Sequence, residues 1–419
     1  MSYYKTYIIK YIVYSIIFVH SSLIAGTTGK IKGKVIDKDT DEPLIGCNIL
    51  VEGTTSGAAT SLDGTYFILN VPPGKYNLIA TMIGYKKVTV QNVEVSSDFT
   101  TSISLALQTE VVSGEEVIVF ASQNKIIKDL TSSTSVVSSE DFDLLPVTEI
   151  SEVLEIQAGY IDGHLRGGRS GEVSYWVDGI AVTDAYNGNA ATSINKNSIE
   201  EMQVISGAFN AEYGHAMSGI VNIITKDGSN QTKAYLSSYL GDFISNKSSL
   251  FQNISDIQLS STKNLDLSLN GPIIKDKLFY FTNARSIRYE GPYSGKRIFN
   301  YYNVSYFDST GSFVVSKPTV LNGDTVYTGY GDNSYVPMDW NEHNYFQLKL
   351  IYKFSPLTKI RFTRINDNKV SQYYDRMYKY NPDGALNHND VSETNIFQIT
   401  KNFNKNTFIN FGGTSFKKT

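Results

Sequence analysis

Apolar and polar residues follow three different patterns along the chain. Between residues 29 and 108, short alternating runs are separated by turn residues such as Asp63-Gly64 and Pro72-Pro73-Gly74. Alternation with a period of two marks strands with one buried face, and closely spaced Gly and Pro turns are typical of a β-sandwich. We therefore predict a β-sandwich over residues 26–108.

Residues 131–229 mix helical and strand-like pieces. Ser138-Ser139-Glu140-Asp141 and Ser198-Ile199-Glu200-Glu201 have capping-box spacing, which predicts that a short helix starts at each. Ile150, Val153 and Leu154 would share one apolar face of a third helix. Strand-like runs lie at residues 173–177, 202–205 and 219–225. The segment is predicted to be a compact, glycine-rich α+β unit.

From residue 230 onward, alternation extends over segments of about ten residues. The clearest are residues 265–269, 277–281, 345–352 and 359–363. Short turns, as at residues 271–276 and 355–356, alternate with long polar stretches such as 291–340. Short turns at one end and long loops at the other are the architecture of an outer-membrane β-barrel. A soluble β-sandwich is the alternative, since each strand signal is weak by itself.

Aromatic residues are distributed unevenly. Of 52 Phe, Trp and Tyr residues, 33 follow residue 229, which leaves 19 in the longer first part. A membrane barrel needs Tyr, Trp and Phe at its two interfaces with the lipid head groups, so this bias favours the barrel.

Charge and cysteine content exclude several classes of function. The 37 Lys and Arg residues nearly balance the 41 Asp and Glu residues, so no electrostatic case exists for a nucleic-acid partner. The single Cys47 excludes a disulfide framework and a cysteine-rich metal site, and it lies in a strand-like stretch where a buried thiol is expected. No cofactor is predicted.

The first 25 residues have the pattern of a secretory signal peptide. Lys5 and Lys10 precede the apolar run 11–19, and small residues follow up to Ala25. The run is too short for a spanning helix of about 20 residues. No later window is apolar enough to span a bilayer as a helix, so membrane insertion would use strands.

Three motifs that would indicate an enzyme or a nucleotide-binding protein do not have the spacing or the structural context that their chemistry requires. None of the five His residues is followed by Glu at zinc-peptidase spacing. Residues 165–171 resemble a phosphate loop but lead into a strand rather than a helix. Around Ser218 the glycines of a nucleophile elbow are displaced, and the strand follows the serine instead of preceding it. We therefore predict that the chain is not an enzyme.

The segment Glu115–Ala121 (Glu115, Glu116, Val117, Ile118, Val119, Phe120, Ala121) is an apolar strand between flexible polar stretches. It is either the last strand of the sandwich or a strand kept free to pair with another protein by β-augmentation. Its composition does not decide between the two.

Two resemblances join these pieces. Residues 33–85 closely resemble the carboxypeptidase-regulatory-like domain, a transthyretin-like sandwich, with its turns at Asp63-Gly64 and Pro73-Gly74 in the expected places. Further along, the chain resembles the TonB-dependent outer-membrane receptors, which are plugged barrels. The motifs shared with their plug, in chain order, are Leu165-Arg166-Gly167-Gly168-Arg169, Trp176-Val177-Asp178-Gly179-Ile180, Ser198-Ile199-Glu200-Glu201-Met202, Tyr213-Gly214 and Ser218-Gly219-Ile220-Val221-Asn222-Ile223.

The second resemblance implies a domain order: signal peptide 1–25, sandwich 26–108, linker with the TonB box 109–130, plug 131–229 and barrel strands 230–419. It also implies that Glu115–Ala121 is the TonB box, the segment to which an energy-coupling protein binds. The family's barrel has 22 strands, which at roughly 20 residues per strand needs well over 400 residues. About 190 residues follow the plug, enough for eight or nine strands, so we interpret the sequence as an N-terminal fragment with an incomplete barrel.

The implied function is substrate import across the outer membrane. The barrel would contact outer-membrane lipid, and the sandwich and TonB box would lie in the periplasm with a TonB-type partner. The substrate stays open between a glycan, a peptide and a metal chelate, and a surface lipoprotein is a further possible partner. An adhesin or sensor on the same scaffold, without transport, is the alternative.

The plug motif is expected to be structural. Arg166 and Asp178 would be structural ions, with an Arg–carboxylate pair at one of them or both. Gly214 and Gly219 would allow turns where a side chain would clash, and Tyr213 would anchor the plug core. Residues 219–225 would form the last plug strand, buried on both faces and therefore continuously apolar except for Asn222.

Overall fold

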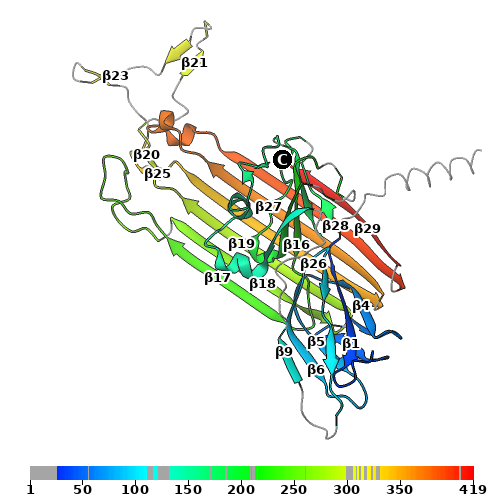
Figure 1. Ribbon diagram of the computed structural model, residues 1–419. Coiled ribbons are helices and arrows are strands. Elements are labelled where there is room, and N and C mark those ends of the chain that lie inside the picture. Colours follow the sequence, from blue (N-terminus) through cyan, green and yellow to red (C-terminus); the bar gives the residue numbers. More distant parts are fainter. Residues whose placement is uncertain are drawn as a thin grey trace, which may run out of the picture.

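The computed structural model describes residues 26–419 except 55, 111–116, 121–131, 170, 185, 208, 210–212, 215, 260, 299–304, 308, 311–312, 316–318, 322–323, 327–330, 356 and 405–406. The predicted signal peptide, Glu115, Glu116 and Ala121 therefore lie outside the described residues. Three β-rich units follow one another along the chain (Figure 1), and the mainly β fold is confirmed. We call them the sandwich (β1–β9), the plug (β10–β16) and the wall (the seven-stranded sheet from β17 to β29).

The sandwich packs two sheets around an apolar core that includes Ile31, Ile49 and Leu78. Its first sheet has the order β4-β1-β7 with β8 also on β1, and its second has the order β3-β2-β5-β6-β9. Cys47 is fully buried in this core, where burial raises the pKa of its thiol to about 11. The strands are β1 Gly29–Asp37, β2 Asn48–Val51, β3 Gly57–Ala59, β4 Thr65–Val71, β5 Gly74–Thr81, β6 Val88–Val95, β7 Thr100–Ser102 and β8 Leu105–Leu107.

The described part of the Glu115–Ala121 segment is an edge strand. Val117–Phe120 forms β9, which pairs in parallel with β6 and has no strand on its other side in the second sheet. Ile118, Val119 and Phe120 are 54%, 44% and 68% exposed. This strand both completes the sandwich and presents apolar side chains and an edge to solvent, so the two interpretations of the segment are compatible.

The plug is a five-stranded mixed sheet of order β10-β15-β16-β13-β14 with short helices. The capping box at Ser138 is present, since Ser138 and Asp141 exchange hydrogen bonds at the start of α2. The elements are β10 Ser133–Ser138, α2 Ser139–Leu144, α3 Ile150–Glu155, β11 Tyr160–Ile161, β12 His164–Leu165, β13 Val173–Val177, β14 Ile180–Ala181, η1 Lys196–Ser198, β15 Ile199–Ser206 and β16 Gly219–Thr225.

The helix predicted to start at Ser198 is wrong. Ser198 is the last residue of the 3₁₀ turn η1, and the residues after it form the strand β15. This strand lies between β10 and β16 and is buried along nearly its whole length. Pairing on both edges and burial of Ile199, Met202 and Val204 outweigh the weak local preference of a capping sequence.

The wall is an antiparallel sheet of order β17-β18-β19-β26-β27-β28-β29. It has seven long strands rather than eight or nine, because most of them are longer than the predicted ten-residue segments. Since β17 and β29 lie at opposite edges, the sheet is not closed. The strands are β17 Lys233–Gly241, β18 Thr262–Ile274, β19 Leu278–Glu290, β26 Trp340–Ser355, β27 Thr358–Gln372, β28 His388–Asn404 and β29 Thr407–Lys418.

Connections between the wall strands differ in length at its two ends. At one end the connections are short, for example residues 275–277 and 356–357. At the other end they are long and carry small elements of their own. These are β20 Ser294–Lys296, β21 Ser305–Phe307, β22 Phe313–Val315, β23 Thr319–Leu321, β24 Asp324–Val326, β25 Tyr335–Pro337, η3 Arg376–Tyr378 and η4 Pro382–Gly384.

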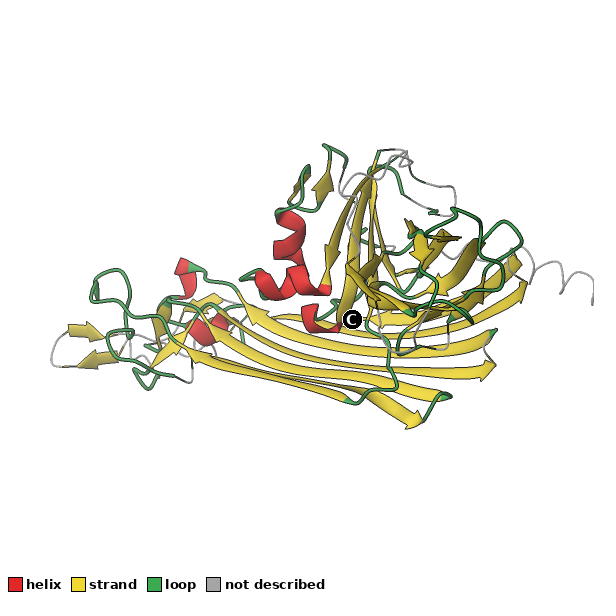
Figure 2. Ribbon diagram, turned by 60° about the horizontal axis from the view of Figure 1, so that its bottom comes forward, coloured by secondary structure: helices red, strands yellow, loops and turns green. Residues whose placement is uncertain are grey.

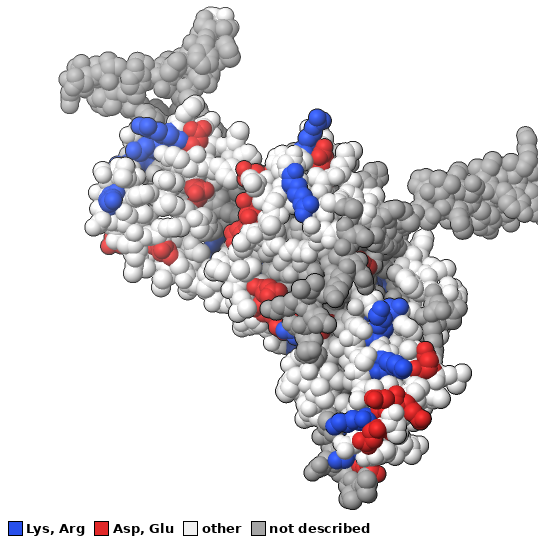
Figure 3. All heavy atoms as spheres, viewed as in Figure 1, with Lys and Arg blue, Asp and Glu red and all other residues white. Residues whose placement is uncertain are grey.

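The plug lies on one face of the wall (Figure 2). Tyr345, Ile365 and Ile396 of the wall belong to the same apolar core as Phe142 and Ile199 of the plug. Charged side chains of both signs are interspersed over the sandwich on the face shown in Figure 3. No helix among the described residues is long and apolar enough to cross a membrane.

Candidate functional site

The face of the wall toward the plug is buried but largely polar. On β26, every second residue points toward the plug, and His343, Tyr345, Gln347 and Lys349 are at most 4% exposed. Polar groups withdrawn from water need hydrogen-bond partners to offset their desolvation. Many of those partners come from loops and strands of the plug, so the plug–wall interface is the candidate functional site.

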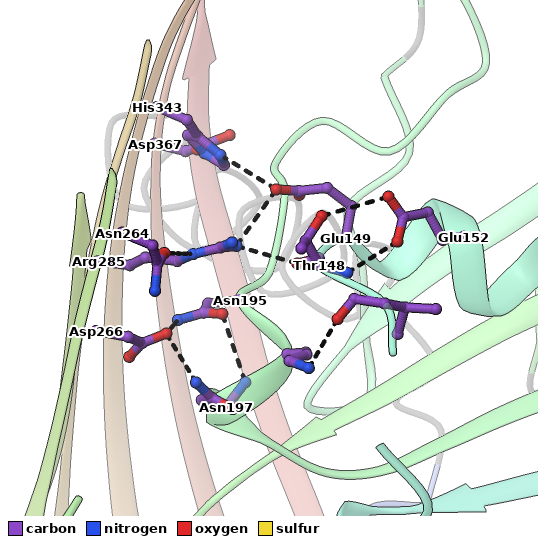
Figure 4. Close-up of polar contacts among 12 residues, drawn as sticks. Thr148, Glu149, Glu152, Asn195, Asn197, Asn264, Asp266, Arg285, His343 and Asp367 are labelled. Carbon is purple, nitrogen blue, oxygen red and sulfur yellow. Dashed lines mark hydrogen bonds and ion pairs between the residues drawn. The ribbon is translucent and has the colours of Figure 1, made fainter. Parts of the chain in front are cut away.

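One cluster forms where the chain enters α3 (Figure 4). Arg285 Nη1 on β19 donates to the carbonyl of Thr148 at 3.1 Å and lies 3.3 Å from Glu149 Oε1. His343 Nδ1 lies 3.8 Å from the same carboxylate oxygen, and its Nε2 pairs with Asp367. Burial alone would raise the pKa of Glu149, but His343 and Arg285 more than offset it and lower that pKa. One plug carboxylate is thereby held by two wall cations.

A second contact in Figure 4 is made by amides. Asp266 Oδ2 on β18 accepts hydrogen bonds from Asn195 Nδ2 at 2.6 Å and from Asn197 Nδ2 at 2.8 Å. Its other oxygen accepts from Asn283 Nδ2 of β19 at 2.7 Å. One oxygen of Asp266 thus binds the turn η1 through two amides, and the other is held by an amide of the wall itself.

The third cluster centres on Lys349, whose side chain is 2% exposed. Its Nζ lies 3.2 Å from Asp178 Oδ2 and 2.6 Å from Asp227 Oδ1, and it donates to the carbonyl of Thr225 at 2.9 Å. Arg361 Nη2 lies 3.5 Å from the other oxygen of Asp227. Burial raises the pKa of Asp227, but Lys349 and Arg361 outweigh it and keep the pKa below its usual value. The exit from the plug is thus fixed to two wall strands.

The two expected structural ions differ in their surroundings. Asp178 and Gly179 have φ of 50° and 78° and connect β13 to β14, as in a two-residue hairpin turn with left-handed backbone. Asp178 accepts from the Thr225 backbone N at 2.9 Å and pairs with a lysine rather than with the expected arginine. Arg166, with φ of 51°, forms no ion pair with any described residue and lies in the exposed turn with Gly167. In that turn Gly168 lies against Ser218, which leaves no room for a β-carbon.

The last plug strand, β16, is buried at every residue, and the polar Asn222 within it is fully buried. Neither polar side-chain atom of Asn222 has a hydrogen-bond partner among the described residues. Beside this strand, Tyr213 is 6% exposed and meets Trp176 edge to face at 5.4 Å. Glu212 and His215 lie outside the described residues.

The two glycines of the 214–219 loop play different roles. A β-carbon on Gly219 would lie 2.0 Å from Leu165 Cδ2 and 2.8 Å from the Ile205 carbonyl oxygen. Around Gly214 no described atom lies within 4 Å of that position, and its φ is not in the left-handed region. The expectation that Gly214 avoids a clash is therefore wrong, whereas Gly219 is required by the close approach of β15.

We expect Gly219→Ala to destabilise the plug by about 1–3 kcal/mol, because the added methyl overpacks against a neighbouring strand. Gly214→Ala is the matched control and should change the free energy of unfolding by less than about 0.5 kcal/mol. Urea unfolding of the two variants, followed by tryptophan fluorescence, measures both values. Equal effects of the two substitutions would contradict the conclusion that only Gly219 is required by a close neighbour.

The sandwich contacts the plug through Lys75, which pairs with Glu140 of α2, and through the loop that holds Ser97 and Asp98. The Ser97 backbone N donates to Glu201 Oε1 at 3.0 Å, and Gln203 Nε2 donates to the Ser97 carbonyl at 2.8 Å. Tyr213 Oη donates to Asp98 Oδ2 at 2.9 Å. Burial raises the pKa of Glu201 to about 7, and that of its neighbour Glu200 also to about 7. The motif residues Glu201 and Tyr213 thus connect the plug to the sandwich.

Sequence reasoning missed most of the residues that join plug and wall. Glu149, Asn195 and Asp227 lie outside the plug motif, and Arg285 and Lys349 were not singled out on their strands. A signal was present in β26, where polar residues at every second position alternate with an apolar set. In a sheet with lipid on one face, that polar face must be covered by protein or water.

Comparison with known proteins gives matches along the chain. Residues 31–119 match the CarboxypepD_reg-like domain, and residues 127–220 match the TonB-dependent Receptor Plug Domain. The chain is 26% identical over 376 residues to TonB-dependent receptor P26 of Formosa agariphila, which covers 84% of this chain and 33% of that protein. It is 29% identical over 222 residues to TonB-dependent receptor SusC of Bacteroides thetaiotaomicron, which covers 48% and 21%.

Among solved structures, the alcaligin outer membrane receptor FauA from Bordetella pertussis is similar, with a TM-score of 0.46 and 11% identity. The similarity covers 70% of this chain and 40% of that one. The chain spans about a third or less of the length of the curated relatives reported above.

Proposed function

The chain belongs to the TonB-dependent receptors, with a carboxypeptidase-regulatory-like domain ahead of its plug, and we propose on this basis that it imports an extracellular substrate across the outer membrane. Energy would come from a TonB-type protein that pulls on Glu115–Ala121 from the periplasm. The observation that carries the proposal is the attachment of the plug. Three polar clusters, rather than apolar packing alone, hold it against the wall.

Polar attachment suits a gate that has to open. Water that enters a separating interface can solvate the carboxylates and cations that part, so the cost of opening is partly offset as the contacts break. An apolar interface gains no such compensation. Local opening at a fraction of the global unfolding free energy is what a movable plug requires.

The other face of the wall supports insertion into lipid. It carries an exposed apolar band, which includes Leu236, Leu240, Leu265, Leu267, Phe346, Phe397, Ile409 and Phe411. The strand registers allow each residue to be projected across the sheet onto β26. Leu240 of β17 projects onto Glu342, and Phe411 of β29 projects onto Tyr352. Leu236 of β17 projects onto Phe346, so the band shifts by six to ten residues over six strand-to-strand steps. This corresponds to a strand tilt of roughly 35–50°, in the range of membrane barrels.

The position of the sandwich indicates which end of the wall faces the periplasm. Arg361 Nη1 of β27, near a short connection, donates to Thr27 Oγ1 at 3.2 Å, and Asn70 of β4 donates to Asn402 of β28. The sandwich therefore lies at the end with the short turns, which is periplasmic in outer-membrane barrels. We place the sandwich and β9 in the periplasm, and the long connections at the substrate side, where a surface lipoprotein would dock.

The edge strand β9 is the feature on which coupling would depend. Its free edge offers main-chain hydrogen bonds to an added strand, and its exposed side chains offer a register. We expect Val119→Pro to weaken binding of the purified periplasmic domain of the cell's TonB protein by at least about tenfold, because proline removes a donor and restricts the strand. Ile83→Pro, in a fully exposed turn of the same sandwich, is the control.

Transport itself is tested by deleting residues 115–121 and measuring growth on the substrate, or uptake of it, in the native host. Loss of uptake with surface binding retained supports import. Unchanged uptake would overturn it. An adhesin or sensor on the same scaffold predicts that binding or signalling persists and that no substrate ever accumulates in the periplasm.

A further inference from the structure

A cavity of about 420 Å³ lies where sandwich, plug and wall meet. Its lining includes the turn after β4, the exit from the plug and the ends of β26 and β27 near the short connection between them. Among the described residues, six Lys and Arg line it against four Asp and Glu, although the chain as a whole is slightly acidic. The excess of positive charge is therefore a property of the cavity and not of the chain as a whole.

Three of these cations are arranged in an unfavourable way. Lys353 and Lys359 are direct cross-strand partners on the face toward the cavity, and Arg361 is the next inward-facing residue of β27. Like charges directly opposite one another destabilise an antiparallel pair. Lys353 lies over the ring of Phe279 at 4.9 Å, but neither lysine forms an ion pair with any described residue.

Arg361 adds a separate observation. The residue is 5% exposed, and its Nε is buried without a hydrogen-bond partner in the described part of the chain. Asp227 and Thr27 contact its Nη atoms, and neither accepts a hydrogen bond from Nε. A buried unpaired donor on a guanidinium costs free energy that a carboxylate or phosphate oxygen would recover.

We propose that this cavity is a binding site for a compact oxyanion, held by Lys353, Lys359 and Arg361. An oxyanion between the two lysines replaces their repulsion by two charge-assisted hydrogen bonds. A tetrahedral inorganic anion and the carboxylate of an acidic sugar share this chemistry. Binding of an anion here does not require transport, because all three residues belong to the paired strands β26 and β27.

The test uses the purified protein in detergent with sodium sulfate and sodium galacturonate as probes, at constant ionic strength set with sodium chloride. Binding is measured by calorimetry, and thermal unfolding is followed in parallel. We expect K353Q/K359Q to weaken binding of the preferred probe by at least about tenfold, since each lost charged hydrogen bond is worth about a factor of ten. Whichever probe binds more tightly identifies the source of the anion.

The matched control is K263Q/K401Q, which removes two exposed lysines that face away from the cavity. It should bind both probes like the wild type. Without either probe, K353Q/K359Q should unfold at the same temperature as the wild type or higher, because repulsion has been removed. A purely structural role for the lysines would lower that temperature instead and overturn the proposal.

A single substitution covers the case in which the double variant does not fold. Glu200 lines the same cavity, and at pH 8, above its raised pKa of about 7, Glu200→Gln removes a negative charge. The variant should then bind the preferred probe about threefold more tightly. Failure of the wild type to bind either probe, or equal binding by the wild type and both cavity variants, would show that no such site exists. Either result would leave the transport proposal untouched.

Discussion

Lys349→Met is expected to weaken attachment of the plug to the wall by about 3–5 kcal/mol, because it leaves buried carboxylates without their cation. Asp178 is 2% exposed at its side chain and would lose its only ion-pair partner among the described residues. Within the described part of the chain, Asp227 would keep only Arg361 as an ion-pair partner, at 3.5 Å. Urea unfolding followed by Trp176 fluorescence, in a Trp340→Phe background, measures the loss on the plug side.

Two further variants make this result interpretable. Lys263→Met removes an exposed lysine of β18 that faces away from the plug and should change stability by less than about 0.5 kcal/mol. Adding Asp178→Asn and Asp227→Asn to Lys349→Met should restore at least half of the loss, because the unpaired charges are then absent. A triple variant no more stable than the single one would mean that packing of the lysine stem, and not charge, holds the plug.

Glu201→Gln should remove a pH dependence from the contact between sandwich and plug. Burial raises the pKa of Glu201 from 4.5 to about 7 in the folded protein. A raised carboxyl pKa means that the folded state binds the proton more tightly, so the stabilisation is complete below about pH 4.5 and is lost as the pH rises through about 7. At pH 8 the variant should be more stable than the wild type by about 3 kcal/mol, at about 1.4 kcal/mol per pKa unit.

Unfolding by urea at pH 5 and at pH 8 separates this effect from the titration of other groups. The stability difference between variant and wild type should be small at pH 5 and large at pH 8. Glu155→Gln, an exposed carboxylate on α3, should give the same difference at both values. A Glu201→Gln variant that is less stable than the wild type at pH 8 would show that the ionised carboxylate stabilises its contacts with Ser97 and Gln203.

Local sequence predicted an element correctly where the pattern within a single segment determines its structure. Three local patterns predicted the element that forms: the capping box at Ser138, the apolar face of Ile150–Glu155, and the run Gly219–Thr225, which is apolar except for Asn222 and Thr225. Local sequence failed at Ser198, where a capping sequence starts a buried strand. It also failed at Gly214, since glycine alone does not reveal whether a neighbour is close.

The sequence by itself determined the kinds of element, their order and the family, because period, turn residues and plug motifs are local properties of the chain. Only the tertiary structure decided which polar residues meet. Lys349 and Asp178 are 171 residues apart, and Arg285 and Glu149 are 136 apart. Partners at such separation are selected by strand register and by how the plug sits on the wall. No single segment encodes that geometry, so the cavity between the three units also appeared only in the folded chain.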